Sequence, residues 1–332
     1  MIISRTPFRI SFFGGGTDYP VWYNKNGGAV INVTINKYCF ITIRRLPPFF
    51  EYKHRIRYYI REDVKSISEI KHPSVRECLK FLNHDDGIEI VHHADLPAQS
   101  GLGSSSTFTV GLLNAIYALN NYMPSKRELA INAIHVEQDL IRENVGSQDQ
   151  TAAAFGGLNR IDFGGNEQIS VKPIILSEEK IQLLQDNLML FFTGLSRTAS
   201  DIAKEQIRST NKKSKELKTM QDLLEEAFSI LISKNTPMDE FGLLMNDQWQ
   251  IKRSITKMIS NSEIDSIYEA GIRAGALGGK LLGAGGGGFI LFYVQPNKQK
   301  SVKNKLKHLL HVPLRFEFTG SQIIYSSHDD NF

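Results

Sequence analysis

Cysteine is scarce in this sequence. Cys39 and Cys78 are the only two in 332 residues, and one pair cannot staple a chain long enough for one large core or two domains. The sequence therefore predicts a reduced, cytoplasmic setting. Long apolar runs are missing as well: none approaches the ~20 residues that cross a bilayer, and we expect no membrane partner. Arg5 and Arg9 interrupt the apolar N-terminus, which argues against a secretory signal.

Charge and histidine spacing give little support for nucleic acid or zinc. The formal net charge is only +4, which suits small anions as readily as nucleic acid. Lysines in segment 297–312 alternate with apolar residues at helical spacing, as on a helix with a solvated basic face. His92 and His93 are adjacent on an expected strand, so they point to opposite faces, and no spacing resembles a zinc site. We expect neither a nucleic-acid partner nor a metal-centred hydrolase.

The first half of the chain is rich in segments that favour strands. Such runs, separated by Gly, Pro or polar turns, occupy residues 5–13, 28–35, 38–45, 54–61 and 87–96. Two helices are expected at 107–120 and 125–144, and the second begins with the capping pattern of Ser125 and Glu128.

The second half is mostly helical from 196 to 274. Strands are expected there at 188–194, 289–294 and 312–318. Strand and helix do not alternate strictly, which indicates an α+β fold rather than a Rossmann domain. The change of composition near 166–180 predicts two domains, with residues 1–175 in the first and 176–332 in the second.

The stretch "LPAQSGLGSSSTF" (96–108) lies between an expected strand and an expected helix. Its small residues let the backbone approach a ligand closely, and the first N–H groups of a helix have no partner within it. Such a corner binds phosphate. The stretch contains no Gly-Lys-Ser/Thr and lacks the third glycine of the dinucleotide-binding pattern. Taken alone, it fits an ordinary Ser-capped turn about as well.

Two further glycine-rich stretches and an acidic one strengthen the hypothesis of a ligand site. "FFGGGTDYP" (12–20) follows the first strand, and "GKLLGAGGGGFILFYV" (279–294) precedes a late one. Consecutive glycines lose much conformational entropy on folding, so close approach to a ligand or loop explains them better than a hairpin. In segment 145–157, Asp149 is suited to orient an attacking hydroxyl, while Glu137 on the preceding helix is suited to hold a metal. The alternative is that each acid is only a helix-end charge.

These motifs, in this order, resemble the GHMP superfamily of ATP-dependent small-molecule kinases, which includes galactokinase, homoserine kinase, mevalonate kinase and phosphomevalonate kinase. The segments that carry the resemblance are "TPFRISFFGGGTDY", "LPAQSGLGSSSTF" and "KLLGAGGGGFILF", and it extends over nearly the whole chain. It implies an S5-like N-terminal domain beside a ferredoxin-like C-terminal domain, with the active site between them. It also implies ATP and Mg²⁺.

The resemblance assigns roles to particular residues. ATP would be bound by the loop residues Gly101, Leu102, Gly103, Ser104, Ser105 and Ser106. Ser105 and Glu137 match metal ligands. Asp149 matches the catalytic base, and Arg9 matches the basic neighbour that keeps this carboxylate ionised. The acceptor would be bound by Gly15, Gly16, Thr17, Asp18, Tyr19, Asp149, Arg197, Gly285 and Gly286.

The first motif departs from the galactokinase pattern, Gly-Glu-His-Thr-Asp-Tyr. Asp18 keeps the carboxylate that grips sugar hydroxyls, but Gly15 replaces the glutamate that contacts the C6 hydroxyl of galactose. The extra room suits a 6-deoxy sugar such as fucose or a bulkier heptose phosphate. Segments 6–20, 143–157 and 191–202 are most similar to bacterial kinases of D-glycero-D-manno-heptose 7-phosphate. That similarity implies phosphorylation of the anomeric hydroxyl to the 1,7-bisphosphate, for nucleotide-activated heptose.

A phosphorylated acceptor needs a cation at its far end. Arg197 is the first candidate, with Lys37 and Arg160 behind it, and a surface ion pair is the alternative for Arg197. Two other functions remain open: a kinase of a free sugar such as fucose or galactose, and a nucleotide-binding regulator that kept the fold but lost catalysis. A regulator would be expected to lack the base, its cation or the metal ligand, all of which are present here. A decarboxylase of the mevalonate branch would have no use for the sugar-gripping segment.

Overall fold

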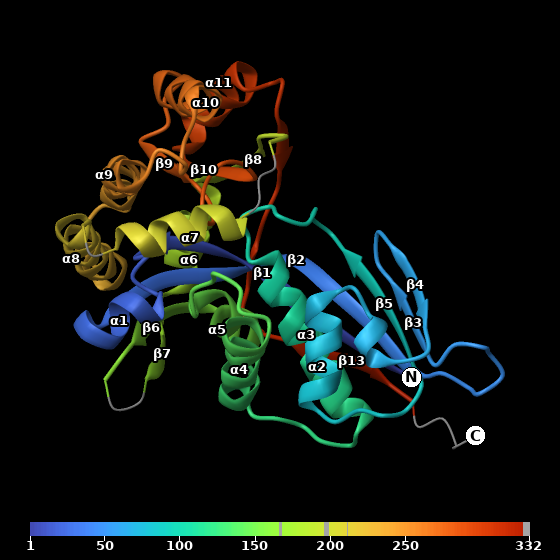
Figure 1. The fold of residues 1–332 in the computed structure, drawn as a ribbon. Coiled ribbons are helices and arrows are strands. Elements are labelled where there is room, and N and C mark those ends of the chain that lie inside the picture. Colours follow the sequence, from blue (N-terminus) through green and yellow to red (C-terminus); the bar gives the residue numbers. More distant parts are fainter. Residues whose placement is uncertain (166–167, 196–198, 211, 328–332) are drawn as a thin grey trace.

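The computed structural model describes residues 1–165, 168–195, 199–210 and 212–327 and has two sheets with helices packed on them (Figure 1). Within these ranges the larger sheet has nine strands, in the order β13-β1-β2-β5-β3-β4, with β6 and β12 also paired to β2 and β7 paired to β6. Its strands are β1 (Ile2–Phe13), β2 (Gly28–Arg45), β3 (His54–Arg57), β4 (Arg61–Val64), β5 (Ile88–Ala94), β6 (Leu158–Phe163), β7 (Ile169–Pro173), β12 (Phe316–Glu317) and β13 (Gln322–Ser326).

The smaller sheet is antiparallel throughout, in the order β11-β8-β10-β9. Its strands are β8 (Leu188–Phe192), β9 (Gly278–Leu281), β10 (Phe289–Tyr293) and β11 (Leu310–Val312). Every residue of β10 is buried, which explains its continuous apolar sequence, since both faces of this central strand are covered.

Helices connect and cover the sheets. Their bounds are α1 (Pro20–Asn26), α2 (Pro73–Phe81), α3 (Ser104–Leu119), α4 (Lys126–His135), α5 (Gln148–Phe155), α6 (Glu178–Asp186), α7 (Ala199–Ser209), α8 (Ser214–Ile232), α9 (Asp239–Ile255), α10 (Ser262–Arg273) and α11 (Pro296–Lys305). A short 3-10 turn spans Ile67–Glu69, and a π-helical turn, Val136–Leu140, extends α4. Within the described ranges, no helix is both long and apolar enough to cross a membrane.

Several expected elements differ in extent from those observed. The runs at 28–35 and 38–45 form the single strand β2, because the Asn36 N–H between them is satisfied by the Arg315 carbonyl oxygen at 2.9 Å. The run at 54–61 is the hairpin of β3 and β4. The run at 312–318 divides at Pro313, which has no N–H for a ladder; β11 before it joins the smaller sheet and β12 after it joins the larger one.

The helix cap predicted at Ser125 is confirmed. The Ser125 side chain accepts a hydrogen bond from the Glu128 N–H at 3.1 Å, so α4 begins with the expected cap. Cys39 and Cys78 are free and buried. The division at residue 175 stays a prediction, and the strand pairing adds one fact: β12 and β13, at the far end of the chain, belong to the larger sheet with β1.

The two sheets meet where β1 ends. Phe12 and Phe13 at this end contact the ring of Phe241 on α9 edge to face, with centroids 5.4 and 5.1 Å apart. Helices α3 and α5 pack on β1 and β2, while α9 packs on β9 and also reaches β1. Elements from distant parts of the sequence therefore converge on one seam.

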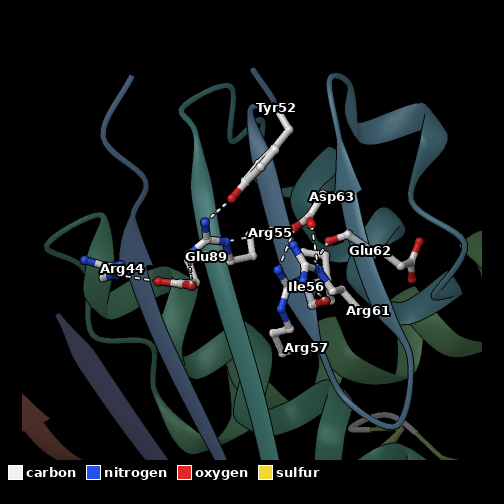
Figure 2. Close-up of polar contacts among 9 residues, drawn as sticks. All are labelled: Arg44, Tyr52, Arg55, Ile56, Arg57, Arg61, Glu62, Asp63 and Glu89. Atoms are coloured by element: carbon white, nitrogen blue, oxygen red, sulfur yellow. Dashed lines mark hydrogen bonds and ion pairs between the residues drawn. The ribbon is translucent and has the colours of Figure 1, made fainter. Parts of the chain in front are cut away.

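Arg44 of β2 and Arg55 and Arg57 of β3 are paired with carboxylates of neighbouring strands, as Figure 2 shows. Arg44 and Arg55 both donate to Glu89, at 2.5 and 2.9 Å, and Arg57 donates to Asp63 at 2.7 Å. The positive charge of this surface is therefore compensated locally by acidic side chains.

Candidate active site

Residues 101–106, predicted to bind ATP and here called the phosphate loop, follow β5 and lead into α3. Gly101 and Gly103 have φ angles of +78° and +79°, in the left-handed region that favours glycine. At Gly101 there is also no space for a side chain, because a Cβ would lie 2.5 Å from the Leu282 carbonyl oxygen. The Ser104 hydroxyl accepts from the Gln99 N–H at 3.2 Å. The backbone is thus bent sharply just before α3 begins. This bend lines a cavity, described below, that other candidate residues also border.

The glycine-rich stretch of residues 283–288 packs against the backbone of the phosphate loop. A Cβ at Gly283 would lie 2.5 Å from Gly101 Cα, and one at Gly288 would lie 2.3 Å from the Ser100 carbonyl oxygen. The Phe289 N–H donates to the same Ser100 oxygen at 3.2 Å. Backbone therefore packs on backbone, which explains why glycines are needed here.

Gly285 and Gly286, assigned from the sequence to the acceptor, lie elsewhere. A Cβ at Gly285 would lie 2.6 Å from Ile259 Cα, and the Gly286 N–H donates to the Ile259 carbonyl oxygen at 2.9 Å. The residues of this stretch that line the cavity are Gly283 and Ala284. The structure corrects the assignment: Gly285 and Gly286 pack against the segment that follows α9.

Arg9 and Asp149 form a bidentate ion pair between β1 and the first turn of α5. The Arg9 Nε and Nη2 atoms donate to the two carboxylate oxygens at 2.7 and 2.8 Å, and Nη1 donates to the Gly101 carbonyl oxygen at 2.9 Å. The Arg9 side chain is 3% exposed and that of Asp149 is 25% exposed, so only the carboxylate faces the cavity substantially. A Cβ at Gly103 would lie 3.3 Å from Asp149 Oδ2. The carboxylate is thus held directly against the phosphate loop.

Glu137 lies on the π-helical turn, buried behind the loop. It accepts hydrogen bonds from Ser106 at 2.7 Å, from Thr109 at 2.8 Å and from Gln150. Burial raises the pKa of Glu137 to about 7, although these three donors act in the opposite direction. Ser105, predicted from the sequence as a metal ligand, lines the cavity and is exposed. The serine bonded to Glu137 is its neighbour Ser106.

The donors around the loop are oxygen atoms. Within the described ranges, no group of three or more His, Cys, Asp or Glu side chains could hold a metal ion. Mg²⁺ commonly uses one or two carboxylates, with substrate phosphates and waters completing its shell. The Ser106 hydroxyl on the Glu137 carboxylate and the Ser105 hydroxyl in the cavity wall fit that chemistry, but they would be an incomplete site without a phosphate ligand.

The first glycine-rich stretch forms a loop after β1. Thr17 is fully buried and its hydroxyl donates to the Gly14 carbonyl oxygen at 2.8 Å, so it shapes the loop and does not line the cavity. Asp18 accepts from the Gly16 N–H at 2.9 Å, and Gly16, Asp18 and Tyr19 line the cavity. Burial raises the pKa of Asp18. The predicted sugar-gripping carboxylate is therefore present in the cavity wall.

Gly15 also lines the cavity and has room for a side chain. The nearest atoms to a Cβ built there are Ser11 Oγ at 3.7 Å and Gln148 Nε2 at 3.8 Å. These are ordinary van der Waals distances, so glycine is not required here by backbone packing.

Arg9, Asp149, Asp18 and the residues Gly101 and Gly103–Ser106 line one cavity of about 370 Å³, whereas Glu137 lies behind its wall. This volume is within the range of roughly 300–1,000 Å³ typical of small-molecule sites. Aromatic rings line one part of it: Tyr58, Tyr59, His72, His92 and Phe108. The rings of His72 and Phe108 stack with centroids 4.6 Å apart. Burial lowers the pKa of His72 to about 4, so this imidazole is neutral at pH 7.

Two buried lysines in the cavity wall were missed by the sequence reasoning. Lys252 on α9 is 6% exposed and Lys280 on β9 is 1% exposed, and both line the cavity. The burial of Lys252 could have been predicted from the sequence. Lys252 follows Phe241, Met245 and Gln248 at helical spacing, on the buried side of α9. Lys280 stands in a short strand that is otherwise glycine and leucine.

Of the cations predicted for the far end of the acceptor, the two that the structure describes, Lys37 and Arg160, are not in the cavity wall. Arg197 lies outside the described residues. Arg160 is bonded to Asp162 at 2.8 Å and to Glu225 at 2.6 Å, and neither it nor Lys37 lines the cavity.

Comparison with known proteins gives the family. Residues 72–157 match the GHMP kinases N terminal domain and residues 220–311 match the GHMP kinases C terminal domain. The chain is 30% identical to D-glycero-alpha-D-manno-heptose 7-phosphate kinase of Campylobacter jejuni, with 96% of each chain covered. The chain belongs to the GHMP kinase family. The predicted family and its two-domain α+β fold are therefore confirmed.

Two further proteins are also similar to this chain. A structure of a D-glycero-D-manno-heptose 1-phosphate kinase from Bacteroides thetaiotaomicron superposes with a TM-score of 0.73 at 25% identity, covering 98% of this chain and all of that one. The bifunctional fucokinase/GDP-fucose pyrophosphorylase of Arabidopsis thaliana is 26% identical over 91% of this chain but 30% of its own length. The similarity is thus highest among these three for the heptose 7-phosphate kinase.

Substitution of Gly103 by Ala tests the phosphate loop. The new Cβ would be forced into the left-handed region and would press on Asp149 and Arg9 at 3.3–3.4 Å. We expect ATP affinity and turnover to fall by roughly tenfold or more, with stability reduced by about 1 kcal/mol. Gly165→Ala is the matched control, since Gly165 has a φ of +76° but no atom within 4 Å of a Cβ. Equal ATP affinity in the two variants would exclude this loop from the site.

Substitution of Lys252 by Met tests whether its buried ammonium destabilises the fold. Burial lowers the Lys252 pKa to about 8 from its ordinary 10.5. The unfolded chain then binds more protons than the folded one between these pH values, so stability should rise with pH over that range. We expect Lys252→Met to be more stable than the parent protein at pH 7 by roughly 1–3 kcal/mol, with the gap closing towards pH 10.5.

Urea unfolding at pH 7 and pH 10 measures this difference. The control is Lys303→Met, which removes an exposed lysine from α11 and should change stability little at either pH. A Lys252→Met variant less stable than the parent protein at pH 7 would contradict the expected cost of burying this charge.

Proposed function

We propose that the protein is an ATP-dependent kinase that phosphorylates the anomeric hydroxyl of D-glycero-D-manno-heptose 7-phosphate, giving the 1,7-bisphosphate. The observation that carries this proposal is the Arg9–Asp149 pair held against the phosphate loop, in a cavity that also contains Asp18 and Tyr19. The similarity to a heptose 7-phosphate kinase over 96% of the chain supports the choice of acceptor.

The cavity lining suggests how ATP is oriented. The neutral aromatic part, with His72 and Phe108, suits a flat base, while the bend at Gly101 and Gly103 suits the phosphates. Ser104 and Ser105 open α3, whose first N–H groups are available to anionic oxygens. We therefore propose that adenine lies near the β3–β4 hairpin and the triphosphate at the start of α3.

Phosphoryl transfer needs a positioned acceptor, neutralised charge and a group that orients the attacking oxygen. Asp149 would accept the proton of the anomeric hydroxyl, and Arg9 would keep that carboxylate ionised and in place. Ser105, Ser106 and Glu137 are the residues proposed to hold Mg²⁺. When bound there, Mg²⁺ would neutralise charge on the phosphate oxygens.

Asp18 and Tyr19 would bind the sugar hydroxyls beside Asp149, and Gly15 would leave room for the phosphorylated arm of the acceptor. The test of the whole proposal is ATP consumption with heptose 7-phosphate, heptose 1-phosphate, free heptose, fucose and galactose. Phosphorus NMR of the product then identifies the phosphorylated carbon. Preference for fucose or galactose would favour a free-sugar kinase, and no turnover with any acceptor would favour a regulator.

The role of Asp149 as a base predicts a selective loss of turnover. Asp149→Asn should lower kcat by roughly 10²–10⁴-fold, because the amide cannot take up the hydroxyl proton. ATP affinity should change little, since the phosphate loop is untouched. Steady-state kinetics with both substrates saturating, and calorimetry for ATP, measure the two effects.

A matched control exists for this change. Asp162 is also bonded to an arginine, Arg160, at 2.8 Å and is 24% exposed, but it lies outside the cavity. Asp162→Asn should leave kcat unchanged. Near-normal turnover in Asp149→Asn would remove the base from the mechanism and leave positioning alone.

The room at Gly15 predicts a change in acceptor preference. Gly15→Glu places a carboxylate in the cavity wall, so it should raise KM for heptose 7-phosphate by roughly tenfold or more through repulsion, and affect a free hexose much less. Gly15→Ala, for which the backbone has space, should behave nearly as the parent protein. Equal losses on both acceptors would indicate that Gly15 has no part in selectivity.

A further inference from the structure

Lys252 and Lys280 are buried lysines without a carboxylate partner. Burial lowers the pKa of both, and for Lys280 the charges of Lys252 and Arg9 add to the effect, so that its pKa lies well below the ordinary value and a bound anion would favour its charged form. The Lys252 Nζ donates to the Gly283 carbonyl oxygen at 2.5 Å, and the Lys280 Nζ donates to the Phe12 carbonyl oxygen at 2.7 Å. Among the described residues, neither ammonium has a carboxylate within 4 Å. An ammonium has three N–H donors, and each of these two has one recorded hydrogen bond.

This arrangement is unfavourable in the free protein. Burying a charge is costly unless it is paired and hydrogen-bonded, and a backbone carbonyl supplies only a partial negative charge. Both side chains line the cavity, so the group that would complete their bonding has to come from solution. An anion that enters the cavity is such a group.

The neighbouring charges leave this part of the cavity positive. Arg9, Lys252 and Lys280 line the same cavity as two carboxylates, Asp18 and Asp149. Arg9 already binds both oxygens of Asp149, and burial raises the pKa of Asp18, which disfavours its charged form. The two lysines therefore have no local counter-charge of their own.

The anchors of the two lysines locate them in the cavity. Lys252 is bonded to Gly283, which packs directly on Gly101 of the phosphate loop. Lys280 is bonded to Phe12, three residues before Gly15 at the proposed acceptor side. A group bound by both ammonium ions would thus lie between the phosphate loop and the acceptor wall.

From this geometry we infer that Lys252 and Lys280 bind a phosphate group in the cavity. The inference rests on the proposed kinase function for the origin of that group, which is either the phosphate of the acceptor or the phosphoryl group in transfer. Ammonium groups bind phosphate as compact point charges. The pair supplies the cationic partner that the sequence had assigned to Arg197.

Binding of inorganic phosphate to the full-length protein tests the site without turnover. Lys252→Met and Lys280→Met each remove one ammonium at similar volume, and calorimetry should show phosphate affinity lowered by roughly 10–100-fold in each. Lys303→Met, on the surface of α11, is the control and should bind phosphate as the parent protein does. Circular dichroism and thermal unfolding establish that each variant is folded; if one is not, the other carries the test.

Kinetics with two acceptors distinguish the sources of the phosphate. If the acceptor's own phosphate is bound, KM for heptose 7-phosphate should rise by roughly tenfold or more in Lys252→Met while KM for free heptose rises much less. If the phosphoryl group in transfer is bound, kcat should fall for both acceptors with little change in KM. Both results support the site and assign its ligand.

Folded Lys252→Met and Lys280→Met variants with unchanged phosphate affinity and unchanged kinetics on both acceptors would overturn the inference. Failure of the parent protein to phosphorylate any acceptor is a different result: it would refute the proposed function, while the binding of inorganic phosphate would still decide whether the lysines form an anion site.

Discussion

The guanidinium of Arg9 is the contact on which the candidate site depends. It binds both oxygens of Asp149 and the carbonyl oxygen of Gly101, so one buried cation joins β1, α5 and the phosphate loop. A guanidinium presents its donors in a fixed planar fork, which sets the carboxylate at a defined position against the loop. Arg9 is paired with Thr34 of β2 on one side, and its N–H donates to the Leu102 carbonyl oxygen at 3.2 Å on the other. The position of the guanidinium is therefore set by the larger sheet and the phosphate loop together.

The glycine stretches complete this arrangement by allowing backbone to touch backbone. Gly283 lies against Gly101, and Gly288 lies against Ser100, at distances that admit no side chain. Any larger residue would push the smaller sheet away from the phosphate loop and with it Lys280, whose strand β9 precedes the stretch. The same contacts thus keep the two sheets together and fix the groups that line the cavity between them.

The sequence predicted what is local and left open what depends on distant pairing. The phosphate loop is a short strand-to-helix connection, so its glycines and serines could be found in one segment. Arg9 and Asp149 are 140 residues apart, and only the family resemblance brought them together before the fold was known. The extent of β2 depends on hydrogen-bond partners elsewhere in the chain. The environment of the Lys252 ammonium depends on which elements pack against α9. A lysine at an apolar position predicts burial, but only the fold places its ammonium in a cavity.

The cavity wall is apolar at one end and positively charged at the other. The buried charge at the positive end links the stability of the fold to ligand binding. Neutral aromatic rings line one part of the cavity, and the bend at Gly101 and Gly103 lines the next. Beyond it lie Lys252 and Lys280, near two carboxylates: Asp149, which is bonded to Arg9, and Asp18, whose charged form is disfavoured by burial. Lys252, with a pKa lowered to about 8 by burial, lowers the stability of the free protein because its charge is poorly compensated. An anion that binds only the folded state returns stability by mass action. The uncompensated charge therefore couples folding to occupancy of the cavity, and a ligand with phosphate at that position gains most from the coupling.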